Sequence, residues 1–127
     1  MKMSETIAEI SEALSIAQGM IDDASKGAKN DYFKSKYADL AAVRSVIRQP
    51  LSANGLAIAQ FPRVSGSSVE VETMLIHKSG EYFSETLQMP IVKQDPHGIG
   101  SAITYARRYG LMSLLCIASE DDDGNAA

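Results

Sequence analysis

The sequence predicts an α+β domain in which N-terminal helices precede a three-stranded antiparallel β-meander and a long final helix. Three observations predict this class. Apolar residues near the N-terminus recur at the helical spacings of three and four. Three central stretches have strand composition and are separated by glycine-containing turns. Asp95-Pro96 then marks the start of a long helical segment. With 127 residues, we expect one core domain over 1–119 and an acidic, disordered tail over 120–127.

The first predicted helix covers residues 5–25. Thr6 followed by Glu9 matches the capping box that begins many helices. The strict spacing suits packing against the same domain, which we favour, and also a helix of a neighbouring subunit. The apolar stripe consists of Met3, Ile7, Ile10, Leu14, Ala17, Ile21 and Ala24.

A second helix is expected over residues 38–52. Pro50 falls late in this segment and predicts a kinked or frayed last turn. Asn54-Gly55 then ends the helix, because both residue types tolerate positive φ. Its apolar face is formed by Leu40, Val43, Ile47 and Leu51.

Three strands follow, over residues 56–62, 69–77 and 82–89. The second alternates most clearly, with Val69, Val71, Thr73 and Leu75 on one face. Turns containing Gly66 and Gly80 separate the strands, so the segment reads as a meander.

The final helix is expected over residues 96–118. Its first half is amphipathic, and its second half is apolar enough to be buried on all sides. At about 100° per residue, Arg108 points away from the apolar face together with Tyr105, whereas Arg107 lies at the edge of that face. The glycines of its first turn, Gly98 and Gly100, allow close approach of another backbone.

Charge is distributed unevenly along the chain. The net charge is −4 and the pI about 5.1, but residues 26–108 carry eleven Lys or Arg against seven Asp or Glu. A local basic groove can therefore function on an acidic protein, since distant exposed charges are screened over about 10 Å. A single cysteine, Cys116, excludes an internal disulfide. Without a signal segment or an apolar run of membrane-spanning length, we expect a cytoplasmic protein with no membrane partner.

Two clusters are candidates for nucleic-acid contact. Arginine presents a fork of donors to phosphate, and tyrosine stacks on unpaired bases. The alternatives stay open at this point: a solvated helix face with one salt bridge, or a soluble loop anchored by its aromatic rings. The first cluster, on the final helix, contains Tyr105, Arg107 and Arg108. The second cluster, in the loop after the first helix, contains Lys34, Lys36 and Tyr37. Arg44 and Arg48 form a basic helix face near this loop.

Enzyme signatures are absent from the sequence. It contains neither a G-x-x-x-x-G-K-[ST] phosphate loop nor a G-x-S-x-G elbow, and its two histidines lack metal-ligand spacing to Cys116. The run at 120–123 offers carboxylates for Mg²⁺, but consecutive acids near a terminus are poorly preorganised, and a solvated tail is favoured. We therefore expect no enzyme, no metal and no cofactor.

Two long motifs resemble those of ERF-type phage recombination proteins. Residues 31–40, DYFKSKYADL, resemble the family's F-K-S-K-Y-A-D-L segment, and residues 100–109, GSAITYARRY, resemble its G-S-A-x-T-Y-x-R-R-Y helix. The hairpin segment 75–81 and the acidic run at 120–123 occur in the same order as in that family, so the resemblance spans about residues 5–124.

The resemblance implies ATP-independent binding of single-stranded DNA and annealing of complementary strands in phage recombination. It also implies a β-β-β-α annealing core, a homo-oligomer in the form of a ring or filament, and an annealed duplex intermediate, and it allows a host single-strand-binding protein as a further partner. Passive protection of single strands, a metal-dependent nuclease and a pure interaction module are the alternative functions. Carried onto matching positions, the resemblance makes Arg107 and Arg108 the first phosphate contacts, followed by Lys34 and Lys36, with Tyr105 and Tyr37 as stacking candidates.

Overall fold

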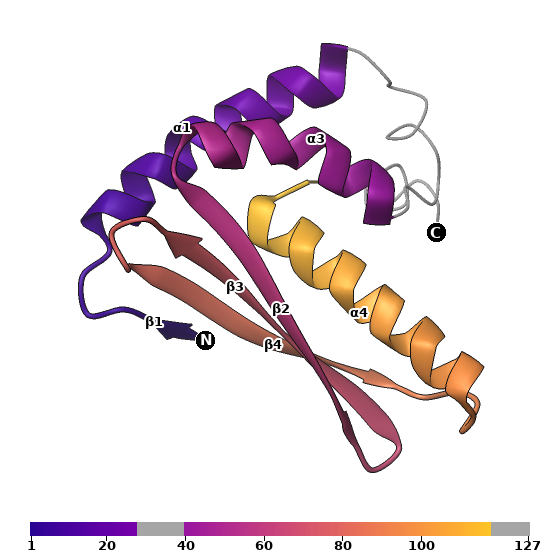
Figure 1. Cartoon of the computed structure of the whole chain (residues 1–127). Coiled ribbons are helices and arrows are strands. Elements are labelled where there is room, and N and C mark those ends of the chain that lie inside the picture. The colour runs from indigo at the N-terminus through magenta and orange to yellow at the C-terminus, as the bar shows by residue number, and fades with distance from the viewer. Residues whose placement is uncertain (28–39, 118–127) are drawn as a thin grey trace.

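The computed structural model describes residues 1–27 and 40–117 (Figure 1). Within these ranges the chain is α+β, as predicted, and its sheet has four antiparallel strands in the order β1-β4-β3-β2. No helix in the described ranges is long and apolar enough to cross a membrane. The elements in chain order are β1 (Lys2–Met3), α1 (Ala8–Gly27), α3 (Leu40–Ala53), β2 (Leu56–Ser65), β3 (Ser68–His77), β4 (Tyr82–Pro90) and α4 (Pro96–Leu115).

The three predicted strands form consecutive hairpins. Alternate residues of β3 from Val69 to His77 are buried, which confirms the predicted inward face. Gly66 and Gly80 have φ of +60° and +94°, so the two predicted turns use glycine where a side chain is strained. Strand β2 extends three residues beyond the predicted end at Pro62, because proline without an N–H is tolerated on the outer side of an edge strand.

The fourth strand is a two-residue segment that sequence periodicity did not predict. Lys2 pairs with Ser84 and Met3 with Phe83, along the outer edge of β4. Met3 was assigned to the apolar stripe of the first helix, and this assignment is wrong: Met3 is 47% exposed on the edge strand. A strand this short has no period of its own, and its pairing depends on residues about 80 positions away.

Helix α1 begins at Ala8 and is capped by a residue that is distant in sequence. The carboxylate of Glu81 accepts the backbone N–H of Ile10 at 2.8 Å and the hydroxyl of Thr6 at 2.7 Å. The predicted capping box of Thr6 and Glu9 is therefore wrong, because the backbone N–H of Glu9 donates to the carboxylate of Glu81. The backbone N–H bond from Ile10, then the Thr6 hydroxyl, lower the pKa of Glu81 below its usual value.

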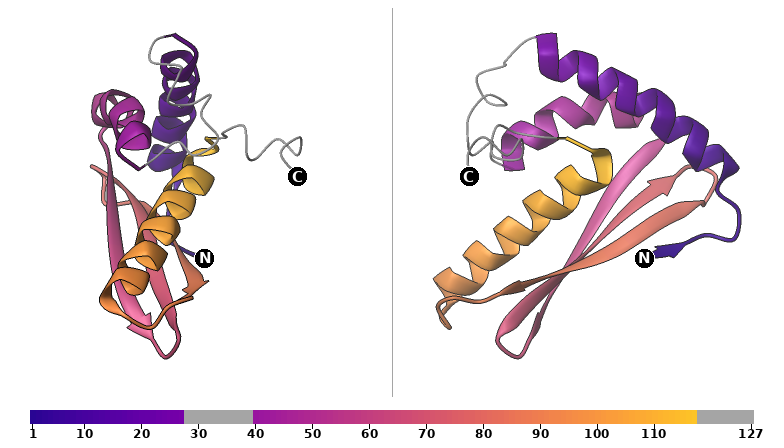
Figure 2. Two further views of the ribbon diagram at one scale, coloured as in Figure 1. Left: turned by 90° about the vertical axis from the view of Figure 1, so that its right-hand side faces the viewer. Right: turned by 180° about the vertical axis from the view of Figure 1, so that it is seen from behind.

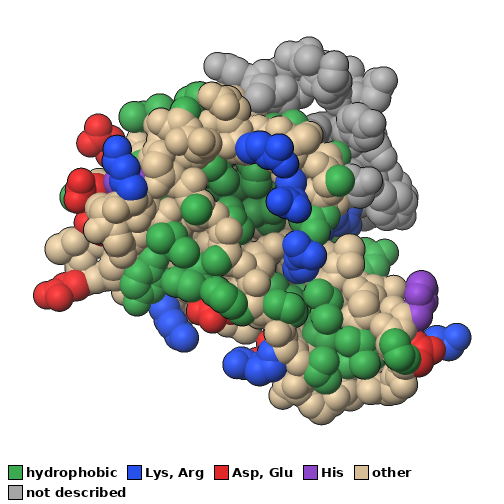
Figure 3. Space-filling model, in the orientation of Figure 1, with side chains coloured by type: hydrophobic (Ala, Val, Ile, Leu, Met, Phe, Trp, Pro, Cys, Tyr) green, Lys and Arg blue, Asp and Glu red, His purple; other side chains and the backbone are tan. Residues whose placement is uncertain are grey.

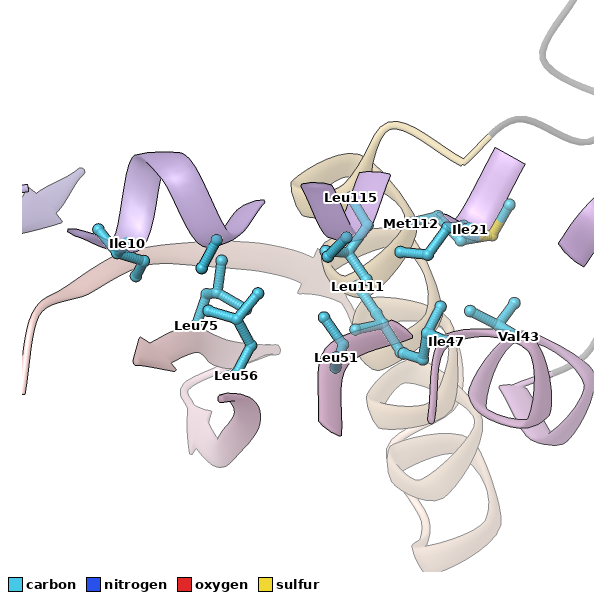
Figure 4. Packing of buried hydrophobic residues seen from close by; sticks show 12 residues of the cluster. Ile10, Ile21, Val43, Ile47, Leu51, Leu56, Leu75, Leu111, Met112 and Leu115 are labelled. Carbon is cyan, nitrogen blue, oxygen red and sulfur yellow. The ribbon is translucent and has the colours of Figure 1, made fainter. Parts of the chain in front are cut away.

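The helices pack together over one region of the sheet. Helices α1 and α3 lie side by side next to the point where β2 begins, and α4 runs along the sheet (Figures 1 and 2). Figure 4 shows Leu111 and Leu115 of α4 pointing towards Ile47 and Leu51 of α3 within the larger core cluster. A smaller cluster lies between α4 and the sheet, where Ala102, Ala106, Val69, Val71 and Ile91 are buried.

The second helix continues through Pro50 to Ala53, so the expected fraying of its last turn is wrong. Its predicted apolar face is confirmed by the burial of Val43, Ile47 and Leu51. Gly55 follows with φ +68°, as the predicted helix end requires.

Helix α4 starts as predicted, with the Asp95 carboxylate accepting the N–H of Gly98 at 2.7 Å. It ends at Leu115, before the predicted end, because Cys116 adopts a left-handed conformation with φ 54°. The N–H of Ile117 then bonds to the carbonyl of Met112, which closes the helix. The second half is not buried on all sides as predicted, since Ser113 is exposed.

Candidate nucleic-acid interface

A groove of about 490 Å³ lies where α3, β2 and α4 meet. In Figure 3, Lys and Arg side chains form a row beside a hollow with a hydrophobic wall. The groove combines three arginines, one glutamine and an otherwise apolar lining: Arg44, Ile47, Arg48, Leu51, Ile58, Gln60, Pro62, Ile103, Arg107 and Leu111.

Helix α3 supplies two of these arginines. Arg44 and Arg48 are four residues apart, so they lie on the same face, about 6 Å apart along the helix axis. Both residues are exposed, whereas Val43 and Ile47 on the adjoining face are buried in the core. Burial of that apolar face therefore turns the two arginines towards the groove. The sequence predicted Arg44 as a contact and Arg48 as its neighbour on a basic face.

Helix α4 supplies the third arginine from the opposite wall. Arg107 is partly buried, and its Nε lies 3.4 Å from Oε1 of Gln60 on β2. The structure thus brings together Arg44 and Arg107, which are 63 positions apart in sequence.

The three groove arginines face no carboxylate within the described part of the chain. No Asp or Glu lines the groove, and the ion pairs found among the described residues involve other groups, such as Arg63 with Glu70. No carboxylate of residues 1–27 or 40–117 therefore neutralises their positive charges. The apolar floor reduces the surrounding polarity, which strengthens the attraction between an arginine and an anion. The arrangement suits a phosphate chain.

Arg108 is not oriented as predicted. It is only 6% exposed, and its guanidinium lies 4.7 Å from the ring centroid of Tyr109 and 5.7 Å from that of Tyr105. The prediction assumed that the side of α4 opposite the sheet is solvent, but α4 also buries residues such as Leu111 and Leu115 against the other helices. Arg108 is consequently less suited to phosphate contact than Arg107.

Tyr105 lies outside the groove. Two residues along a helix rotate the side chain by about 200°, so Tyr105 is about 160° around α4 from Arg107. Its ring is 49% exposed and stacks on Tyr109, with centroids 6.1 Å apart and planes 13° from parallel. Its proposed stacking on bases stays a prediction, and any such contact belongs to a different surface from the arginine groove.

The remaining predicted contacts, Lys34, Lys36 and Tyr37, lie outside the described residues. So does the acidic run at 120–123. Among the described residues, no group of three or more His, Cys, Asp or Glu is placed to hold a metal ion.

Gln60 was not among the contacts predicted from the sequence. Its polar side chain on the same strand face as the apolar Leu56 and Ile58 is the sequence feature that could have indicated a role for it. Its amide Nε2 donates to the Thr73 hydroxyl and to the Arg107 carbonyl, at 3.0 Å each. Gln60 therefore links β2, β3 and α4 at the floor of the groove.

Fold and site together define a small α+β domain with an arginine-lined groove suited to a polyanion. The chain belongs to the ERF superfamily, whose family model matches residues 10–127. No curated protein and no solved structure gave a significant match. The family assignment confirms the resemblance to ERF-type proteins and associates the chain with single-strand annealing and recombination in phages.

Proposed function

We propose that this protein binds single-stranded DNA along the arginine groove and anneals complementary strands without ATP. The observation that carries the proposal is the convergence of Arg44, Arg48 and Arg107 on one groove, whose described lining residues include no Asp or Glu. Single-stranded DNA is a flexible polyanion, and arginine forks bind phosphate oxygens bidentately. The family to which the chain belongs supports DNA, rather than another polyanion, as the ligand.

In the proposed mechanism, the arginines hold the backbone of one strand extended and leave base edges accessible to a second strand. Neutralising phosphates reduces the repulsion between the two strands, and base pairing then proceeds downhill without covalent chemistry. Each subunit needs only a modest affinity if a homo-oligomer, as a ring or filament, repeats the groove along the DNA. Backbone contacts read little base identity, so binding is expected to be independent of sequence.

The binding part of the proposal is tested by fluorescence anisotropy of a labelled single-stranded oligonucleotide over a salt series. For single strands, the slope of log K against log salt is about 0.7 per neutralised phosphate, so replacing Arg44, Arg48 and Arg107 with alanine should reduce the slope by about 2. The control is Lys93→Ala, which removes one exposed positive charge before α4. A triple variant that binds with wild-type affinity and slope would refute the groove.

A passive protector of single strands would also bind DNA, so annealing is measured separately. With complementary oligonucleotides, the proposed protein speeds pairing, whereas a protector slows it. Incubation of labelled DNA with Mg²⁺ tests the nuclease alternative, which predicts shortened products.

A further inference from the structure

Gln60 lines the groove but carries no charge that could neutralise a phosphate. It lies on β2 and is partly buried between the arginines of α3 and Arg107 of α4. Strand neighbours on the same face, Ile58 and Pro62, are apolar, so packing alone does not require a polar side chain here. Its contacts suggest what the amide does.

The hydrogen bonds fix the orientation of the Gln60 amide. The main-chain carbonyl of Arg107 can only accept, so the group facing it at 3.0 Å must be the NH2 of Gln60. The same NH2 also lies 3.0 Å from the hydroxyl of Thr73, a residue that is 4% exposed. Because both of its hydrogens are engaged, the amide presents its Oε1 in one fixed direction.

That oxygen lies 3.4 Å from Nε of Arg107. This distance is long for a hydrogen bond, so the contact adds little binding energy and mainly sets the orientation of the guanidinium. With Nε facing Gln60, the two terminal nitrogens of the fork remain for an anion in the groove. A glutamate at the same position could accept from Nε of Arg107 but would neutralise its charge, and it could not donate to the main-chain carbonyl of Arg107.

We propose that Gln60 is a positioning residue, which aims Arg107 into the groove while leaving its charge available. The inference rests on the proposed DNA binding, because it assigns Gln60 a role in the same groove. Gln60 contacts Arg107 at two points: its NH2 donates to the main-chain carbonyl of Arg107, and its Oε1 faces Nε of the guanidinium.

A double-mutant cycle tests the proposal. Gln60→Met keeps the side-chain length and removes the three polar contacts of the amide. It should weaken single-strand binding roughly three- to tenfold, the scale of one ordinary hydrogen bond. In an Arg107→Ala background the same change should have no further effect on binding, although it should lower Tm equally in both backgrounds. Gln88→Met, at an exposed position of strand β4, is the matched control and should leave binding unchanged.

Gln60→Glu provides the second variant. A carboxylate beside Arg107 should weaken binding and reduce the salt slope by about 0.7, as if one phosphate contact were lost. Equal weakening by Gln60→Met in both backgrounds, or no weakening at all, would overturn the positioning role.

A measurement without DNA separates this proposal from the proposed function. In NMR spectra of the ¹⁵N-labelled protein, the Arg107 Nε–H should exchange slowly with water and lose this protection in Gln60→Met. Unchanged exchange in the variant would refute the positioning role. Failure of the wild-type protein to bind DNA at low salt, with protection intact, would instead refute the proposed function alone.

Discussion

Arg107 and Arg108 are neighbours in sequence, but α4 turns their side chains about 100° apart, and their surroundings differ accordingly. Arg107 lines the groove, where its guanidinium faces the neutral amide of Gln60. Arg108 is buried against the rings of Tyr105 and Tyr109. Under the proposed function, Arg107 therefore serves DNA binding, whereas its neighbour Arg108 serves stability.

This separation predicts opposite phenotypes for two single substitutions. Arg108→Ala should lower the free energy of unfolding by about 1–3 kcal/mol, through loss of buried packing and of the contacts with both tyrosine rings. Arg107→Ala should leave stability nearly unchanged and weaken DNA binding. Urea unfolding and anisotropy on both variants check this split. The reverse pattern, with Arg108→Ala stable but unable to bind, would restore Arg108 as the phosphate contact.

Glu81 predicts a pH-dependent contribution to stability. Its pKa in the folded protein is lowered by the N–H of Ile10 and the hydroxyl of Thr6, so the ionised form is favoured by folding. The contribution is therefore fully present above the unfolded pKa of about 4.3 and is lost as pH falls through the lower folded value. Glu81→Gln should lower Tm at pH 7, and the gap to wild type should shrink towards pH 3.

The exposed Glu5→Gln serves as the control for Glu81→Gln, because no described contact involves the Glu5 side chain. It should follow the wild-type Tm at every pH. A gap for Glu81→Gln that stays constant down to pH 3 would show that packing, rather than charge, explains the effect.

At the scale of elements, the first turn of α4 requires glycine at position 98 but not at position 100. A Cβ on Gly98 would collide with the carbonyl of Lys93, whereas a Cβ on Gly100 has no neighbour within 4 Å. Gly98→Ala should destabilise the protein by about 1–3 kcal/mol through overpacking. Gly100→Ala should stabilise it by up to about 1 kcal/mol, because alanine favours a helix. Thermal unfolding of both variants checks the contrast, and equal effects would contradict it.

Elements with a local signal were predictable, and those defined by distant partners were not. The burial of alternate β3 residues and the Asp95 cap follow from nearby sequence alone. Strand β1 and the cap supplied by Glu81 depend on residues more than 70 positions away, which a periodicity analysis does not connect. Arg108 was predicted to lie on a solvent-exposed face of α4, but α4 packs on two sides and buries it.

The same limit applies to the candidate site. The four-residue spacing of Arg44 and Arg48 is visible in the sequence, as is the basic character of the region around Arg107. Their convergence with Gln60 requires α3, β2 and α4 to meet, and no local pattern encodes this meeting. Sequence therefore predicted two of the arginines as contacts, but neither the groove nor its neutral floor residue.

At the scale of the whole molecule, charge is segregated so that a protein of net charge −4 retains a basic groove. Glu5, Glu9 and Glu12 are exposed on or next to α1, on a different element from those that form the groove. Screening over about 10 Å keeps the two regions largely independent at physiological salt. Because phosphate contacts release counterions from the DNA, lowering the salt should strengthen binding despite the net negative charge.

The central claim, that the arginine groove drives annealing, is tested most directly by the rate at which two complementary labelled oligonucleotides pair, followed by energy transfer. We predict that the wild-type protein and Lys93→Ala accelerate pairing without ATP, and that the triple alanine variant of Arg44, Arg48 and Arg107 does not. Equal acceleration by the triple variant would contradict the account, and slower pairing with the wild-type protein would identify a protector of single strands instead.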